Sequence, residues 1–236
     1  MIISKIKSFI ITLLGLAIIP IYHQWSSKLF REPLLKVWEI GTSPESWREI
    51  YNGFGSNLFS ENDGIILEPK AARKPQETHA NLVLVKKTEI HPLKDFLISM
   101  KVSTEKQLRT PLPNPWEALW VFFNYSQSEN EPPKTNYFIL KKNGIEIGKA
   151  FEGSKQDLLF TQKSPQLVLG KIYWISIIKS GDQLEVLIDG SPVIHFSPVS
   201  KSVKLYDLPG SVGIYSEDAR VHIYDFSILP LNFNLI

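Results

Sequence analysis

The sequence predicts an all-β protein: an antiparallel, two-sheet β-sandwich of the jelly-roll type, preceded by one N-terminal apolar helix. Two observations predict the sandwich. Apolar and polar residues alternate with a period of two along the chain after about residue 36, and tight-turn residues separate many of these stretches. Helical periodicity is weak over the same region, and many short strands with little helix favour two antiparallel sheets.

The N-terminal segment is apolar and follows two basic residues. From Ser8 to Ser27 there are 20 residues without Lys, Arg, Asp or Glu, after Lys5 and Lys7. This length lies between a signal-peptide core and a membrane span of about 20 residues. Since no small-x-small cleavage pattern follows, we expect residues 1–25 to form an uncleaved signal-anchor. A cleaved signal peptide, which would make the protein secreted, is the alternative.

The charge distribution separates this segment from the rest of the chain. Of the 26 basic residues, four lie in residues 1–31, where there is no acidic residue, and the other 22 accompany all 24 acidic residues. A slightly acidic body argues against binding to a nucleic-acid backbone. The absence of cysteine excludes a disulfide scaffold, cysteine-ligated zinc and thiol catalysis. We therefore expect a linker at 26–36 and one domain at 37–236, outside the cytoplasm.

One short helix and about eleven strands are expected in the body. The helix is predicted from Glu45 to Ile50, with Ser43 as N-cap and Pro44 at the first helical position. The strands are predicted at Gly64–Glu68, Leu82–Lys86, Phe96–Val102, Ala118–Tyr125, Tyr137–Lys141, Leu158–Thr161, Ile172–Lys179, Leu184–Ile188, Val193–Phe196, Ser211–Tyr215 and Val221–Ile228.

Turn residues connect several of these strands. Residues 180–182 (SGD), 189–190 (DG) and 142–144 (KNG) are typical of tight hairpins. The proline-rich stretch 110–115 and the polar stretch 126–133 are longer, and they flank the aromatic strand 116–125. We expect these two loops to form a rim on one side of a sheet.

Several stretches of the body resemble the sequence pattern of a known superfamily. They are residues 115–120 (PWEALW), 137–149 (YFILKKNGIEIGK), 169–173 (LGKIY) leading to Asp189-Gly190, and 208–221 (LPGSVGIYSEDARV) followed by residues 224–226 (YDF). Over about residues 36–229 the chain resembles the concanavalin A-like lectin/glucanase superfamily, in particular its laminin-G-like and 3-keto-disaccharide-hydrolase-like domains. The resemblance implies the sandwich fold, but the superfamily includes binding modules, hydrolases and lyases.

The aromatic strand carries the first candidate ligand residues. Strict alternation places Trp116, Trp120 and Asn124 on one face, and Glu117 on the other. Sugar rings stack on exposed aromatic faces, and carboxylates and amides bind sugar hydroxyls. We therefore predict a sugar groove that includes these four residues. The alternative is that the two tryptophans pack in the core.

The hairpin that follows carries a second group. Lys141, Glu146 and Lys149 are predicted to face the same groove, and Gln156 in the stretch 152–157 is expected at its rim. The alternative for the first three is an exposed strand face with cross-strand charge pairs. We expect Glu217 and Asp218 to form a turn.

The resemblance also implies candidate catalytic acids and candidate calcium ligands. Hydrolases of the superfamily's laminarinase-like branch carry Glu-x-Asp-x-x-Glu on one strand, which this chain lacks, leaving Glu117 and Glu146 as candidate acids. The resemblance also implies a structural calcium ion, for which Asp225 and Glu39 are the candidate ligands; the alternative is a solvated Asp225. The sequence thus favours a membrane-anchored, extracytoplasmic module for carbohydrate binding or surface interaction, with carbohydrate or a cell-surface glycan as its partner. A glycan-active hydrolase and a surface domain without ligand are the alternatives.

Overall fold

The computed structural model describes residues 36–151, 155–198, 200 and 203–231. The chain divides into two compact units, residues 1–36 and 37–236. The predicted signal-anchor and most of the predicted linker lie outside the described residues. Among the described residues, no helix is long and apolar enough to cross a membrane.

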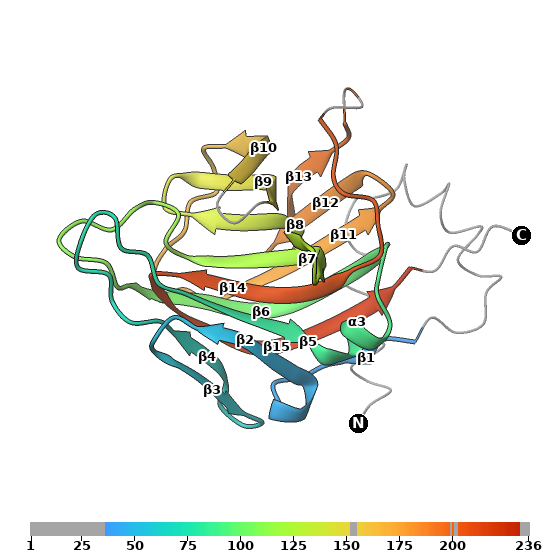
Figure 1. Ribbon diagram of the computed structural model, residues 1–236. Helices are drawn as coiled ribbons and strands as arrows, with labels where there is room; N and C mark the ends of the chain where they lie inside the picture. The colour runs from blue at the N-terminus through green and yellow to red at the C-terminus, as the bar shows by residue number, and fades with distance from the viewer. Residues whose placement is uncertain (1–35, 152–154, 199, 201–202, 232–236) are drawn as a thin grey trace, which may run out of the picture. The chain divides into compact units, whose positions relative to one another are not determined.

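The second unit is a sandwich of two antiparallel sheets, which we call sheet A and sheet B (Figure 1). Sheet A has the order β13 (Ser191–Phe196), β12 (Gln183–Ile188), β11 (Tyr173–Ser180), β6 (Phe96–Gln107), β15 (Ala219–Pro230), β4 (Gly64–Glu68) and β3 (Ser56–Ser60), with β1 (Trp38–Glu39) paired to β15. Sheet B has the order β10 (Lys155–Gln162), β9 (Gly144–Phe151), β8 (Glu131–Lys141), β7 (Leu119–Ser128), β14 (Ser211–Glu217), β5 (Ala80–Val85) and β2 (Trp47–Asn52). The predicted fold class is therefore confirmed for the sandwich.

The core lies between the two sheets and is filled by alternate residues of each strand. Phe96 and Met100 of β6 and Val121 and Phe123 of β7 are fully buried, and the Phe96 and Phe123 ring centroids are 5.7 Å apart in an edge-to-face arrangement. Burying one such side chain contributes about 1.5–3 kcal/mol. The opposite side chains of the same strands point outward, and on sheet B those of Trp120 and Phe122 line a surface groove.

The predicted hairpins are confirmed. Asp189 and Gly190 connect β12 and β13 with φ angles of +51° and +79°, as expected for a two-residue turn of type I′. Residues 180–182 lie between β11 and β12, and residues 142–144 between β8 and β9. The stretch 126–133, predicted as a long loop, is instead the end of the β7–β8 hairpin, because both strands continue into it.

The predicted helix at Glu45–Ile50 is wrong. A 3₁₀ turn, η1 (Pro44–Ser46), is followed directly by strand β2, which pairs with β5. The buried Trp47 ring packs edge-on against Phe226 at 5.1 Å, and its Nε1 donates to the carbonyl of Gly41. Pairing and burial of this tryptophan outweigh the local helix signal. The short helix α3 (Lys86–Ile90) and strands β1 and β3 were not predicted, whereas β9 was expected only as the second strand of the hairpin at 142–144.

Candidate functional site

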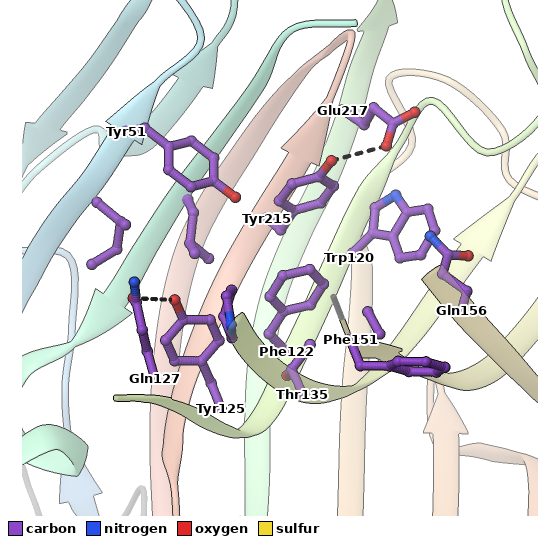
Figure 2. A pocket seen from close by; sticks show the side chains of 14 residues that line it. Tyr51, Trp120, Phe122, Tyr125, Gln127, Thr135, Phe151, Gln156, Tyr215 and Glu217 are labelled. Carbon is purple, nitrogen blue, oxygen red and sulfur yellow. Dashed lines mark hydrogen bonds between the residues drawn. The ribbon is translucent and has the colours of Figure 1, made fainter. Parts of the chain in front are cut away.

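The outer face of sheet B carries a groove of about 270 Å³ (Figure 2). Six of the residues that line it are aromatic, and they come from β2, β7, β9 and β14. The described residues that line the groove are Ile50, Tyr51, Leu82, Trp120, Phe122, Tyr125, Gln127, Pro133, Thr135, Ala150, Phe151, Gln156, Tyr215 and Glu217. Gln156, expected at the rim, is among them.

The register of three central strands brings the aromatic rings together. Tyr215 of β14 is the cross-strand partner of Trp120 of β7, and Tyr137 of β8 is the partner of Phe122. The Tyr215 ring stacks on Phe122 with centroids 4.9 Å apart, and it meets Trp120 edge-on at 5.8 Å. These offset and edge-on contacts are the favourable geometries for aromatic pairs. They hold the rings in one layer across the sheet.

A β-bulge in β7 changes which residues face the groove. Asn124 has φ +52°, a left-handed conformation that asparagine tolerates better than most residues, and the pairing of β7 with both neighbours shifts there. Its buried side chain donates to the carbonyls of Leu93 and Leu208 and accepts from Asn136. Tyr125 consequently lines the groove, where strict alternation had put Asn124.

Polar groups stand at two ends of the aromatic layer. At one end Glu217 accepts hydrogen bonds from the Tyr215 hydroxyl (2.9 Å) and from Trp116 Nε1 (3.1 Å). At the other end the Tyr125 hydroxyl donates to Gln127 Oε1 at 2.8 Å (Figure 2). Burial raises the pKa of Glu217, and it raises the pKa of Tyr215 well above its ordinary value. The tyrosine hydroxyls therefore remain donors at neutral pH.

Glu146 lies on the same face, one strand beyond Tyr137. Its carboxylate accepts from the Tyr137 hydroxyl at 2.7 Å and forms an ion pair with Lys141. Gly148 permits this arrangement, since a Cβ atom there would overlap the Tyr137 hydroxyl and ring. Glu146 and Lys141 thus fix Tyr137 beneath Trp120, whose ring is 4.8 Å away.

No protein-family model matches this chain, and no curated protein sequence matches it. Solved structures do match. The VIP36 exoplasmic/lumenal domain, in a Ca²⁺/Man3GlcNAc-bound form, has a TM-score of 0.55 at 12% identity, covering 85% of this chain and 93% of that one. Carbohydrate-binding module CBM66 from Bacillus subtilis has 0.52 at 12%, covering 77% and 94%. Bacillus licheniformis β-glucanase has 0.51 at 6%, covering 82% and 96%. The fold is the concanavalin A-like jelly roll.

In this jelly roll Glu117 lies beneath the rim, away from the groove. Its side chain is 0% exposed, forms an ion pair with Arg109 and accepts from Asn114 Nδ2 at 2.9 Å. Arg109 Nη2 also donates to Asp218 Oδ2 at 2.7 Å, and Asp218 is equally buried. The predicted ligand role of Glu117 is corrected on this ground: a buried carboxylate needs a partner, and Arg109 supplies it.

The other predicted ligand residues divide between the two faces of sheet B. Trp120 lines the groove, and Trp116 stands at its rim beside Glu217, 43% exposed. Glu146 and Lys149 are three residues apart in one strand, so the pleat sends their side chains to opposite faces. Lys149 pairs with Asp157 at 3.3 Å and lies over the Tyr206 ring, on the face turned from the groove. Asn124 is buried in the bulge, as described above.

The two candidate acids for hydrolysis do not come together as a catalytic pair. Glu117 is buried with Arg109, and the carboxylate of Glu146 is bound by Tyr137 and Lys141. Among the described residues that line the groove, Glu217 is the one carboxylate. The sequence predicts Glu217 in a turn, but Glu217 is the last residue of β14, and its two-residue spacing from Tyr215 is the local signal that both side chains face the same way.

The residues predicted to bind calcium do not assemble a site in the described part of the chain. Asp225 and Glu39 are exposed, and Asp225 Oδ1 accepts from the backbone N–H of Phe226 at 2.8 Å. No group of three His, Cys, Asp or Glu residues that could hold a metal ion occurs among residues 36–151, 155–198, 200 and 203–231. Calcium takes about six to eight oxygen ligands, and two exposed carboxylates do not fit that requirement.

Proposed function

We propose that the domain binds carbohydrate in the sheet B groove. The observation that carries the proposal is the layer of six aromatic side chains with a carboxylate at one end and an amide at the other. The apolar faces of sugar rings pack on aromatic rings, while hydroxyls exchange hydrogen bonds with carboxylate, amide and phenol groups. The groove offers both kinds of contact on one surface.

The size of the groove and the fold both support this proposal. At about 270 Å³ the groove lies just below the range of about 300–1,000 Å³ for small-molecule pockets, which suits a short segment of a glycan. Solved structures with the same fold include a carbohydrate-binding module and the VIP36 exoplasmic/lumenal domain in its Ca²⁺/Man3GlcNAc-bound form. Since a fold does not determine a function, the groove residues carry the argument.

Binding is tested with the full-length chain on a panel of immobilised glycans. We expect at least one glycan to bind, and Tyr51→Ala or Trp116→Ala to weaken that binding by about 5–30-fold, equivalent to about 1–2 kcal/mol. Trp174→Ala is the matched control, because Trp174 is 51% exposed on the outer face of sheet A, against 43% for Tyr51 and for Trp116. Failure of the folded protein to bind any glycan, or equal losses in the control, would sink the proposal.

A glycan-active hydrolase is the second candidate, because burial raises the pKa of Glu217, as a general acid requires. A partner acid is the difficulty. Glu146 lies three strands from β14, and its carboxylate is bound by Tyr137 and Lys141, so among the described residues that line the groove Glu217 is the one carboxylate available to a glycosidase pair. Release of reducing ends from the bound glycan, abolished by Glu217→Gln, would favour hydrolysis over binding.

We propose further that residues 1–25 anchor the protein in a membrane with the domain outside the cytoplasm. The support is the uncharged stretch Ser8–Ser27 that follows Lys5 and Lys7. An anchored protein remains in the membrane fraction after alkaline carbonate and leaves it in detergent, and external protease digests the domain in intact cells. Recovery of a shortened chain from the medium would instead indicate cleavage.

A further inference from the structure

The charge of the groove is unbalanced toward the acidic side. None of the described residues that line it is Lys, Arg or His, and Glu217 is the one that carries a charge. Both oxygens of Glu217 accept from neutral donors, Tyr215 Oη and Trp116 Nε1. No ion pair to Glu217 exists among the described residues; its direct contacts are these hydrogen bonds, and Arg109 beneath the rim interacts with it through space only.

The surroundings of Glu217 do not supply the missing cation. Asp218 and Glu117 lie close enough to raise its pKa further, after burial. Arg109 is committed to those two carboxylates beneath the rim. Arg48, which approaches the groove near Tyr125, donates to Glu89 Oε1 at 2.8 Å, and this contact raises the pKa of Arg48. The field along the groove is therefore negative at the Glu217 end.

The position of Glu217 is fixed from below. Trp116 and Glu217, joined by a hydrogen bond at the rim, are each followed in the sequence by a carboxylate that binds Arg109. Arg109 also donates to the carbonyl of Lys74 at 3.0 Å. One buried guanidinium thus holds both the loop before β7 that carries Trp116 and the end of β14 that carries Glu217, so Glu217 is oriented before any ligand arrives.

We propose that Glu217 makes the groove selective for glycans that carry no acidic group. This inference rests on the proposed carbohydrate binding. The carboxylate accepts hydrogen bonds from sugar hydroxyls that replace or join those from Tyr215 and Trp116. A uronate carboxylate or a sulfate at the same place meets a like charge in a partly buried, aromatic surrounding, and no basic side chain of the described lining compensates it.

The test compares matched glycans on the full-length chain. Oligosaccharides of glucose, galactose and mannose are presented beside the same oligosaccharides oxidised at C6 to uronates. We expect the neutral form of the bound glycan to be preferred by at least about tenfold. In Glu217→Gln this ratio should fall toward one. Glu185→Gln, on sheet A, is the matched control and should keep the wild-type ratio, since Glu185 pairs with His195 away from the groove.

The outcomes separate this inference from the proposed function. Absence of binding to every neutral and oxidised glycan overturns both. Binding of the oxidised form as tightly as the neutral form overturns the selectivity alone, and this wild-type measurement needs no variant. A Glu217→Gln protein that folds, binds and retains the full preference for neutral glycans overturns the role of Glu217.

Discussion

The outer faces of the two sheets are made from similar alternating strands, yet they differ in chemistry. On sheet B, rings from neighbouring strands meet in register and form the groove. On sheet A, the exposed Trp174 ring and the half-buried Tyr224 ring each lie 5.7 Å from the ammonium of Lys101, and Arg220 pairs with Glu68 and Glu105. Aromatic content alone does not make a groove. The rings must occupy adjacent positions, with charged side chains excluded from the space between them.

The largest expected difference is the loss in free energy of unfolding when an arginine is replaced, Arg109 at the groove rim of sheet B or Arg220 on sheet A. Arg109→Met leaves two buried carboxylates beneath the rim without their cation, and we expect it to lower the free energy of unfolding by about 3–5 kcal/mol. Arg220→Met removes ion pairs that are about a third exposed, and it should cost no more than about 1 kcal/mol. Denaturant unfolding of both variants measures the difference. Equal costs would mean that Arg109 is not the support of the groove rim.

A smaller difference is expected at two residues with a left-handed backbone. Asn124→Ala removes hydrogen bonds to buried carbonyls and keeps the positive φ, and we expect a loss of about 2–4 kcal/mol together with weaker glycan binding through displacement of Tyr125. Asp189→Ala, in an exposed turn of sheet A, should lose about 1–2 kcal/mol without affecting binding.

Asn124→Gly separates the loss of side-chain hydrogen bonds from the strain of a positive φ. Glycine adopts the same φ without strain, so the remaining loss reports the side-chain hydrogen bonds of Asn124. Unfolding of the three variants, with binding measured beside it, checks the prediction. If Asp189→Ala weakens binding as much as Asn124→Ala, the bulge has no special relation to the groove.

The smallest expected difference is between Glu217 and Glu105, whose contributions to stability should change in opposite directions as the pH rises. Burial raises the pKa of Glu217, so the folded state holds its proton more tightly than the unfolded state. The resulting stabilisation is complete below the ordinary pKa of 4.5 and is lost as the pH rises through the raised value. The stability of the wild type relative to Glu217→Gln should therefore fall as the pH rises.

Glu105 on sheet A should behave in the opposite way. Burial raises its pKa, but hydrogen bonds from Arg220 and His222 outweigh burial, and the net pKa is lowered. The stability of the wild type relative to Glu105→Gln should therefore be present above pH 4.5 and fall as the pH decreases through the lowered value. Thermal melting of both variants across the acidic range tests the two predictions, and parallel trends would contradict the assignment of Glu217 to a partly buried position without an ion pair.

Local patterns predicted the fold class and most of its central strands. Asp189-Gly190 and residues 180–182 form tight turns because their preferred backbone angles require no help from distant residues. Strand β2 was missed for the opposite reason: the burial of Trp47 against Phe226 comes from a residue about 180 positions away. Trp120 could also be predicted as a groove residue, because its place in an apolar strand can be recognised from the neighbouring sequence.

The sequence by itself determined that this chain is an all-β sandwich with an apolar, basic-flanked N-terminal segment and an aromatic strand at Ala118–Tyr125. Tertiary structure alone decided which of its polar residues face the groove. The bulge at Asn124 makes Tyr125 face the groove in place of Asn124, and the ion pair with Arg109 keeps Glu117 buried. Pairing of β14 with β7 brings Glu217 and Tyr215 beside Trp120. Each outcome depends on cross-strand register and on the need of buried charges for partners, and both join residues far apart in the chain.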